Sequence, residues 1–333
     1  MRILLFGTVL AIALLFGFNQ LTFASCGPAG ANTFVCNTNA PNPDPDGLQL
    51  LGNDNNLTVN VLPGAAIDTS LQPMLDDDGI ELGDGNDMVT VDGGSVIGED
   101  AAMNVRNGNN IITLTNAVIR GITDPAIRGG ANQDNLTIEN SLITSVDSDV
   151  MSLTNGEDIV TVRNSQLIVL TASGGDSAIS AGNGADQVFI ENSYLQGGTS
   201  GSGQPSAISL GNDDDTLTLG TGSELAGIVS NGSIVPGLIR CGNDFDTIVF
   251  AMAVPSDQVA EITAEIESKD HAGDSIVINR LFYQWEDCEE LIPELTGGFI
   301  SPVPTLSEWG LIATAGILGF IGFMVIRRRQ VTA

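Results

Sequence analysis

Seven turns in the sequence are rich in glycine, asparagine and aspartate, and several of their side chains could bind a metal ion. We call the last polar residue of each turn the marker residue. The markers are Asp87, Asn110, Asp134, Asp158, Asp186, Asp215 and Asp246. Because Ca2+ prefers carboxylate and carbonyl oxygens, the column Asp134, Asp158, Asp186 and Asp215 is a candidate for weakly held Ca2+, the one cofactor that the sequence suggests.

The spacing of the markers separates two interpretations of these turns. Successive markers are 23, 24, 24, 28, 29 and 31 residues apart. The turns resemble the calcium-binding repeats of RTX β-rolls, but those recur every ~9 residues, whereas these turns would meet only by stacking. We therefore favour a structural role, in which Asn and Asp side chains bond the backbone of their own turn and tolerate left-handed conformations, while Gly supplies positive φ. Ca2+ held between stacked carboxylates is the alternative.

Acids and arginines of the same repeats could also act on polysaccharides. A lyase needs clustered acids and an Arg or Lys base, and a hydrolase needs two carboxylates that face one cleft. However, Arg120, Arg128 and Arg163 occupy different offsets of the repeat, and only the Gly/Ser-rich segment 197–206 interrupts it as an insertion. We expect no enzyme, and keep a surface polysaccharide lyase or hydrolase as the alternative.

The elements that must position these turns are short strands. Residues two and four places after each marker are apolar, a period of two that indicates a half-buried strand. The residues seven places before the markers are also all apolar: Ile80, Met103, Ile127, Met151, Ile179, Ile208 and Ile239. Together with a third strand from the NSxL-type segments, this self-similarity predicts an all-β, parallel, right-handed β-helix of about eight coils over residues 47–255.

Two further columns support stacking. Six places after the markers stand Asn116, Asn140, Asn164 and Asn192, which predict an asparagine ladder. One place earlier, Arg163 lies between Glu139 and Glu191 in sequence order of the coils, so opposite charges would be neighbours. We interpret both columns as structural.

Residues 256–296 are predicted to cap the stack, since exposed strand edges pair with other chains. Ser256 is expected to cap a short amphipathic helix, and Tyr283 and Trp285 to cover the open end. The layout of residues 47–292 resembles the β-helical passenger regions of bacterial surface proteins and autotransporters, which implies a fold more than a function.

The N-terminus predicts export. Residues 1–24 have a charged start, an apolar stretch and a small-residue region, typical of a signal peptide cleaved after Ala24; lipidation of Cys26 is the alternative. Thiols of exported proteins tend to oxidise, so we predict disulfides Cys26–Cys36, closing an entry segment at 25–46, and Cys241–Cys288. Free buried cysteines are the alternative to these disulfides.

Charge excludes one class of partner. The chain has a net charge of -30, with 11 basic and 41 acidic residues. Four of the basic residues lie at the two ends, which leaves the body near -33 (7 basic against 40 acidic residues). Nucleic acid phosphates would be repelled, so nucleic acid is not an expected partner.

The C-terminus has three parts. A linker at 297–310 ends in VPTLSEWG, an apolar run at 311–326 is long enough to form a short transmembrane helix, and the basic tail 327–333 begins with Arg327, Arg328 and Arg329. This tail resembles the IPTL-CTERM sorting signal of Gram-negative bacteria, with Val303 in place of isoleucine. The matching residues are Pro304, Thr305, Leu306, Trp309 and Gly310.

The resemblance implies that an exosortase-type membrane transpeptidase removes the tail. The body would pass from an inner-membrane intermediate to the cell surface, outer envelope or extracellular matrix, with extracellular polysaccharide or a surface acceptor as further partner. A plain membrane anchor is the alternative. We therefore expect an exported, acidic β-helix protein that acts as a structural, adhesive or extracellular-matrix component.

Overall fold

The computed structural model describes residues 26–39, 42–50, 55–71, 77–171, 174–199, 204–271 and 273–297. The predicted signal peptide, sorting motif, membrane segment and basic tail lie outside these residues, so the structure does not test them. Within the described ranges, no helix has the length and apolar character needed to cross a membrane.

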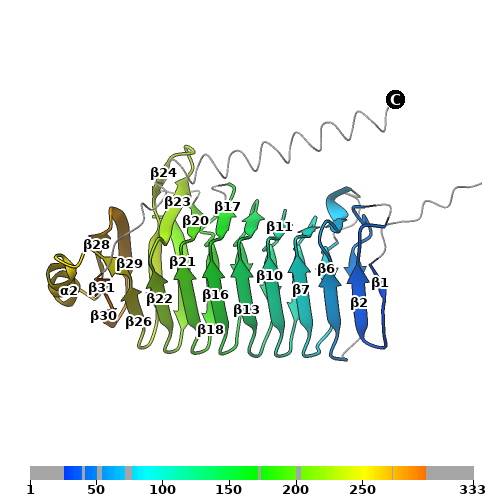
Figure 1. Ribbon diagram of the computed structural model, residues 1–333, viewed down its shortest axis with the longest axis horizontal. Helices are drawn as coiled ribbons and strands as arrows, with labels where there is room; N and C mark the ends of the chain where they lie inside the picture. Colours follow the sequence, from blue (N-terminus) through cyan, green and yellow to red (C-terminus); the bar gives the residue numbers. More distant parts are fainter. Residues whose placement is uncertain are drawn as a thin grey trace, which may run out of the picture.

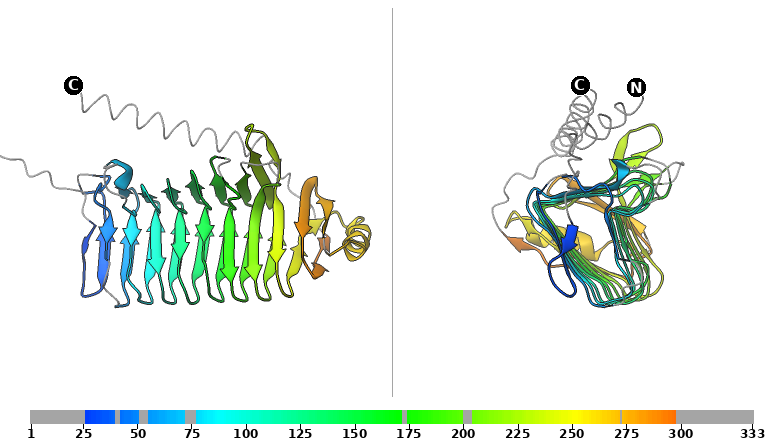
Figure 2. Two further views of the ribbon diagram at one scale, coloured as in Figure 1. Left: turned by 180° about the vertical axis from the view of Figure 1, so that it is seen from behind. Right: turned by 90° about the vertical axis from the view of Figure 1, so that its right-hand side faces the viewer.

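The chain forms a parallel β-solenoid in which each coil gives one strand to each of three sheets (Figures 1 and 2). Sheet A consists of β1 (Cys26–Pro28), β2 (Thr33–Cys36), β4 (Thr58–Val61), β7 (Met88–Asp92), β10 (Ile111–Thr115), β13 (Asn135–Glu139), β16 (Ile159–Arg163), β19 (Gln187–Glu191), β22 (Thr216–Gly220), β26 (Thr247–Ala251) and β30 (Glu290–Pro293). The predicted all-β fold class is thereby confirmed.

The other two long sheets complete the coil. Sheet B consists of β5 (Ala66–Asp68), β8 (Ser95–Ile97), β11 (Val118–Gly121), β14 (Leu142–Ser145), β17 (Gln166–Val169), β20 (Tyr194–Thr199), β23 (Glu224–Val229) and β24 (Ile234–Pro236). Sheet C consists of β3 (Leu48–Gln49), β6 (Ile80–Glu81), β9 (Met103–Arg106), β12 (Ile127–Gly129), β15 (Met151–Ser152), β18 (Ile179–Asn183), β21 (Ser206–Asn212), β25 (Leu238–Gly242), β29 (Leu281–Glu286) and β28 (Gly273–Ile278). A 3-10 turn, η1 (Thr69–Leu71), follows β5.

About seven coils are complete. The next coil contributes β25 and β26, but its third strand, β27 (Ala253–Val254), leaves sheet B and pairs with β31 (Thr296–Gly297). The last coil therefore turns from the repeat into the cap.

Stacking of equivalent residues builds the core. In sheet A, Ile112 pairs in register with Leu136, and Leu136 pairs with Val160. In sheet C, the apolar residues seven places before the markers pair with one another in the same way, for example Ile127 with Met151. All of these side chains are buried, which confirms the predicted inward positions and the stacking of the repeat.

The turns between sheets C and A permit very close stacking. At Gly184, which has a φ of 119°, an added Cβ would lie 1.6 Å from the carbonyl oxygen of Gly156 in the preceding turn. A side chain there would clash with backbone, so this turn needs glycine for both its conformation and its spacing.

The N-terminal end is closed by an antiparallel hairpin. Strand β1 pairs with β2, and the two are joined by the Cys26–Cys36 disulfide. The predicted pairing is therefore confirmed, and the described part of the chain begins at this cross-link.

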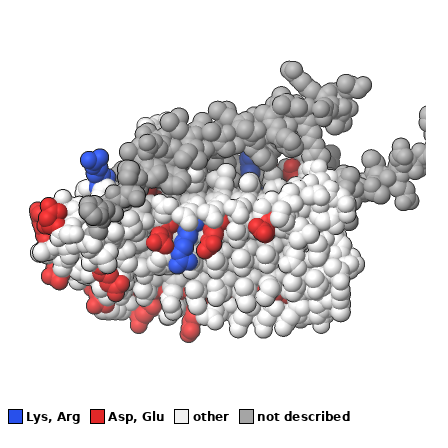
Figure 3. All heavy atoms as spheres, viewed as in Figure 1, with Lys and Arg blue, Asp and Glu red and all other residues white. Residues whose placement is uncertain are grey.

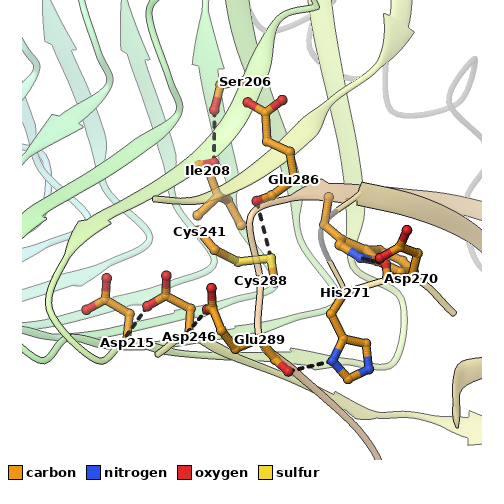
Figure 4. Close-up of a disulfide and its surroundings, with 11 residues drawn as sticks. Ser206, Ile208, Asp215, Cys241, Asp246, Asp270, His271, Glu286, Cys288 and Glu289 are labelled. Atoms are coloured by element: carbon orange, nitrogen blue, oxygen red, sulfur yellow. Dashed lines mark hydrogen bonds between the residues drawn. A yellow bond between two sulfur atoms is a disulfide. The ribbon is translucent and has the colours of Figure 1, made fainter. Parts of the chain in front are cut away.

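The C-terminal end is covered by β28, β29, β30 and helix α2 (Val259–Glu267) (Figure 1). Tyr283 and Trp285 are buried, and both contact the ring of Phe250 edge to face, with centroids 6.0 and 6.1 Å away. The Cys241–Cys288 disulfide ties this cap to β25 of the last, incomplete coil (Figure 4). Both the cap and this second predicted disulfide are confirmed.

The predicted start of the helix was wrong. Helix α2 begins at Val259, and its N-cap is Gln258, which makes no side-chain capping bond, rather than Ser256. The Gln258 N–H donates to Pro255 O at 2.9 Å, so residues 255–258 form a turn and the helix can begin only after it. Ile262 and Ile266 of this helix are buried.

Adjacent inward and outward residues allow a test of the core. Ile138 is buried between Leu114 and Val162, whereas Thr137 points outward from the same strand. We predict that Ile138→Ala costs about 2–5 kcal/mol of unfolding free energy, while Thr137→Ala changes it by roughly 0.5 kcal/mol or less. Urea unfolding of the two variants would measure this, and equal losses would contradict the assigned register.

Candidate functional site

The marker residues form one continuous hydrogen-bonded column, which we call the marker column. The backbone N–H of each marker donates to Oδ1 of the marker in the next coil. For Asp134, Asp158 and Asp186 as donors the distances are 2.6, 2.7 and 2.7 Å. Each marker stands just before a sheet A strand, and its N–H points along the stack toward the next coil. The marker side chain of that coil accepts this N–H, so the ladder of hydrogen bonds between the strands continues into the turn.

The column has a defined beginning and end. It starts at the Leu57 N–H, which donates to Asp87 Oδ1 at 2.7 Å. It ends in the cap, where the Asp246 N–H donates to Glu289 Oε2 at 2.7 Å (Figure 4). Each coil is therefore tied to the next by a side chain as well as by its strands.

The second carboxylate oxygen of these aspartates is in a different position. Six markers have a buried Oδ2 atom with no hydrogen-bond partner among the described residues. They are Asp87, Asp134, Asp158, Asp186, Asp215 and Asp246. Burial raises the pKa of Asp134 to about 7 and that of Asp215 to about 8, and neighbouring carboxylates raise both further. Burial also raises the pKa of Asp158 to about 6 and that of Asp186 to about 7. These groups are poorly solvated as anions.

The structure brings the predicted Ca2+ residues, Asp134, Asp158, Asp186 and Asp215, together in this column. Their Oδ1 atoms are already bonded to backbone N–H groups. In the ranges that the structure describes, no three acidic, histidine or cysteine side chains are grouped so that they could hold a metal ion. The sequence interpretation expected these side chains to bond the backbone of their own turn. The structure instead places their bonds on the backbone of the turn in the preceding coil.

A second buried column, of serines, follows the turn between sheets A and B. The N–H groups of Ser141 and Ser165 donate to the Oγ atoms of Ser165 and Ser193, at 3.0 and 3.1 Å. Each hydroxyl then donates to a carbonyl oxygen of its own coil, two residues earlier in the sequence, as Ser165 does to Arg163 O at 2.7 Å. This serine column was not predicted, although the repeated Asn-Ser pair is visible in the sequence.

The predicted asparagine column is present, but backbone conformation explains it best. Asn116, Asn140, Asn164 and Asn192 all have φ between 46° and 52°. One amide–amide bond joins two of them, from Asn192 Nδ2 to Asn164 Oδ1 at 2.7 Å. Asparagine is favoured here because it tolerates the left-handed conformation that this turn requires.

A longer asparagine ladder, not predicted, lies three residues before the markers. Asn183 Nδ2 donates to Asn155 Oδ1 at 2.7 Å, Asn212 Nδ2 to Asn183 Oδ1, and Asn243 Nδ2 to Asn212 Oδ1 at 2.6 Å. The signal for it was the asparagine inside the GN and TN pairs of the later turns.

The arginines considered for catalysis lie on three different sheets. Arg120 is in β11 of sheet B, Arg128 in β12 of sheet C and Arg163 in β16 of sheet A. Arg128 pairs with Asp124 at 2.6 Å, and Arg163 with Glu191 at 3.2 Å, in the predicted register between Glu139 and Glu191. The three guanidinium groups are therefore presented by three different sheets of the solenoid.

The outer side of sheet A forms a regular surface. Two columns of outward residues carry no charge from β4 to β26, and we call them the neutral face. The first consists of Thr58, Met88, Ile111, Asn135, Ile159, Gln187, Thr216 and Thr247, and the second of Asn60, Thr90, Thr113, Thr137, Thr161, Phe189, Thr218 and Val249. Figure 3 shows a broad uncharged area on this side of the molecule, with a row of acidic and basic side chains beside it.

Comparison with known proteins gives one region an identity. Residues 301–330 match the family model described as the IPTL-CTERM motif. No curated protein and no solved structure matches the chain. The chain thus combines a β-solenoid with a C-terminal sorting motif, which implies processing by an exosortase-type enzyme and an exported or cell-surface protein.

The state of the marker column leads to a prediction about Ca2+. Since each Oδ1 already accepts an N–H, we predict no stoichiometric, micromolar Ca2+ binding in calorimetric titrations. Excess Ca2+ should raise the unfolding temperature only through screening of the negative charge, and Mg2+ should do the same at equal concentration. A saturable heat of binding specific to Ca2+ would instead make the column a metal site.

Proposed function

We propose that this protein is a surface rod of a Gram-negative cell, acting as a structural, adhesive or extracellular-matrix component that contacts extracellular polysaccharide through the neutral face. The observation that carries this proposal is the neutral face itself. A chain with a net charge of -30 keeps two adjacent columns of one sheet uncharged over eight coils. Such an arrangement favours a contact surface over a solvated exterior.

The chemistry of the neutral face fits a repeating polymer. Thr90, Thr113, Thr137 and Thr161 pair in register, so their hydroxyls recur along the rod at the strand spacing of about 4.8 Å. Hydroxyls can both donate and accept, and Phe189 follows them in the same column. An extended, uncharged polysaccharide laid along the rod could use these groups repeatedly, with many weak contacts adding to useful avidity.

Electrostatics narrows the class of polymer. The surrounding body is strongly negative, so a polyanionic chain would be repelled before it reached the face. An uncharged polysaccharide has no such barrier. We therefore propose a neutral extracellular polysaccharide as the partner, and attachment of the released body at the surface after removal of its tail.

Matched variants on two sheets test the face. We predict that Thr137→Glu together with Thr161→Glu abolishes most binding on a glycan array, because two charges then interrupt the neutral face. The control is Ser152→Glu with Ser180→Glu, which adds the same charge to neighbouring coils on the outer side of sheet C. Equal binding by both pairs, or release of uronic acid by the purified chain, would contradict the proposed role.

Processing of the tail can be tested separately. We predict that Pro304→Ala with Thr305→Ala leaves an unprocessed chain in the inner membrane, because the change alters the motif and leaves the apolar run 311–326 intact. Mass spectrometry of the mature C-terminus in the native host measures this. A wild-type chain that still ends at Ala333, located like the variant, would mean that the tail is only an anchor.

A further inference from the structure

Buried serine, asparagine and aspartate side chains each accept a backbone N–H from the neighbouring coil of this solenoid. The serines and the asparagine also have a hydrogen to donate. The serines of the A–B turns accept an N–H from the neighbouring coil and donate their hydroxyl hydrogen to a carbonyl of their own chain. Asn110, in the marker column, accepts the Asp87 N–H on Oδ1 at 2.9 Å. Its Nδ2 points at the carbonyl oxygens of Val105, Arg106 and Gly108, at 3.4, 3.3 and 3.2 Å.

The aspartates occupy the position of Asn110 without its amide hydrogens. Their Oδ1 atoms accept the same kind of bond. Their Oδ2 atoms, which correspond chemically to Nδ2 of Asn110, are buried and have no partner among the described residues. An ionised Oδ2 could not bond a turn carbonyl, because both atoms are acceptors. A proton on Oδ2 would convert each aspartate into a donor like Asn110 and would remove a buried, unpaired charge.

We infer that the buried aspartates of the marker column carry a proton on Oδ2 in the folded rod, so that proton uptake from the medium stabilises the stack. The column is then a proton-linked device that strengthens the protein as its surroundings become acidic. For a protein of the cell exterior, whose medium is not buffered by the cytoplasm, this couples the stability of the rod to local pH.

The charged side chains that face the column are all acidic, and they favour the proton. Asp215 is flanked by Asp186 and Asp246 of the neighbouring turns and by Asp213 of its own turn. Asp246 is faced by Glu289 from the cap and by Asp214 and Asp244 from the turns. The interactions resolved for the column in the described residues include no basic side chain. What opposes burial is hydrogen bonding from backbone N–H groups and, at Asp134, also from the Asn110 side chain.

The sign of the pH dependence follows from these raised pKa values. Between the ordinary aspartate pKa near 3.8 and the raised values of about 6 to 8, the folded chain binds more protons than the unfolded chain. The contribution of the column to stability is therefore greatest below the ordinary aspartate pKa, and it is lost as the pH rises through the raised pKa values. This dependence is opposite to that of a carboxylate held in a salt bridge.

The test compares two adjacent aspartates in the full chain, purified in mild detergent. Asp215 is buried in the marker column, whereas Asp214 is exposed beside it. At pH 9 in EDTA, Asp215→Asn should lower the unfolding equilibrium constant by about tenfold or more, since a pKa difference of about one between folded and unfolded chain is worth a factor of about ten. The gain should shrink at pH 5.5. Asp214→Asn removes only one of the exposed charges that face Asp246, so its gain at pH 9 should be much smaller.

The reciprocal variant and a spectroscopic measurement complete the test. Asn110→Asp should destabilise the chain at pH 9 and much less at pH 5.5. In the wild-type chain at pH 5.5, infrared spectra should contain the carbonyl band of protonated carboxyl groups, weaker in Asp215→Asn and lost on titration to pH 9. Absence of that band in the wild type, equal effects of the two neighbouring substitutions, or restoration of stability at pH 9 by Ca2+ would overturn the inference.

Discussion

The structure depends on one constraint, which is that each turn must find its hydrogen-bond partners in the coil beside it. Strands satisfy one another directly, but the N–H groups at the turns have no strand to pair with. Asp134 and Asp158 meet this need at the C–A turn, and Ser141 and Ser165 at the A–B turn. A buried N–H without a partner would cost about 1–3 kcal/mol, repeated in every coil, so the polar columns are as necessary to the fold as the apolar core.

This constraint also explains how the chain combines a high negative charge with a regular surface. Part of its acidity lies inside, where aspartates serve backbone groups rather than solvent. Because the turns contain many polar side chains, two outward columns of sheet A can remain uncharged, as at Thr113 and Thr137. The C-terminal motif implies that this rod is an exported or cell-surface protein.

Much of this fold could be predicted from the sequence because the same pattern of apolar and turn residues recurs in every coil. The inward residues, such as Ile127 and Met151, were visible from a constant offset to the marker. The ladder of Asn155, Asn183, Asn212 and Asn243 was missed because Ala131 and Asp84 interrupt the same offset in earlier coils. The serine column was missed because its role depends on the distance between coils, which the sequence pattern does not give. The helix start at Val259 was missed because the turn after Pro255 uses Ser256.

The most direct test of the account is hydrogen exchange at the marker amides, measured residue by residue in the folded chain. If marker side chains bind the N–H groups of the preceding coil, the amides of Asp134, Asp158 and Asp186 should exchange as slowly as those of core strand residues such as Ile138. The amide of Glu157, exposed in the same turn as Asp158, should exchange much faster. Marker amides that exchange as fast as that of Glu157 would contradict the account, since the coils would then be held by strands and core alone.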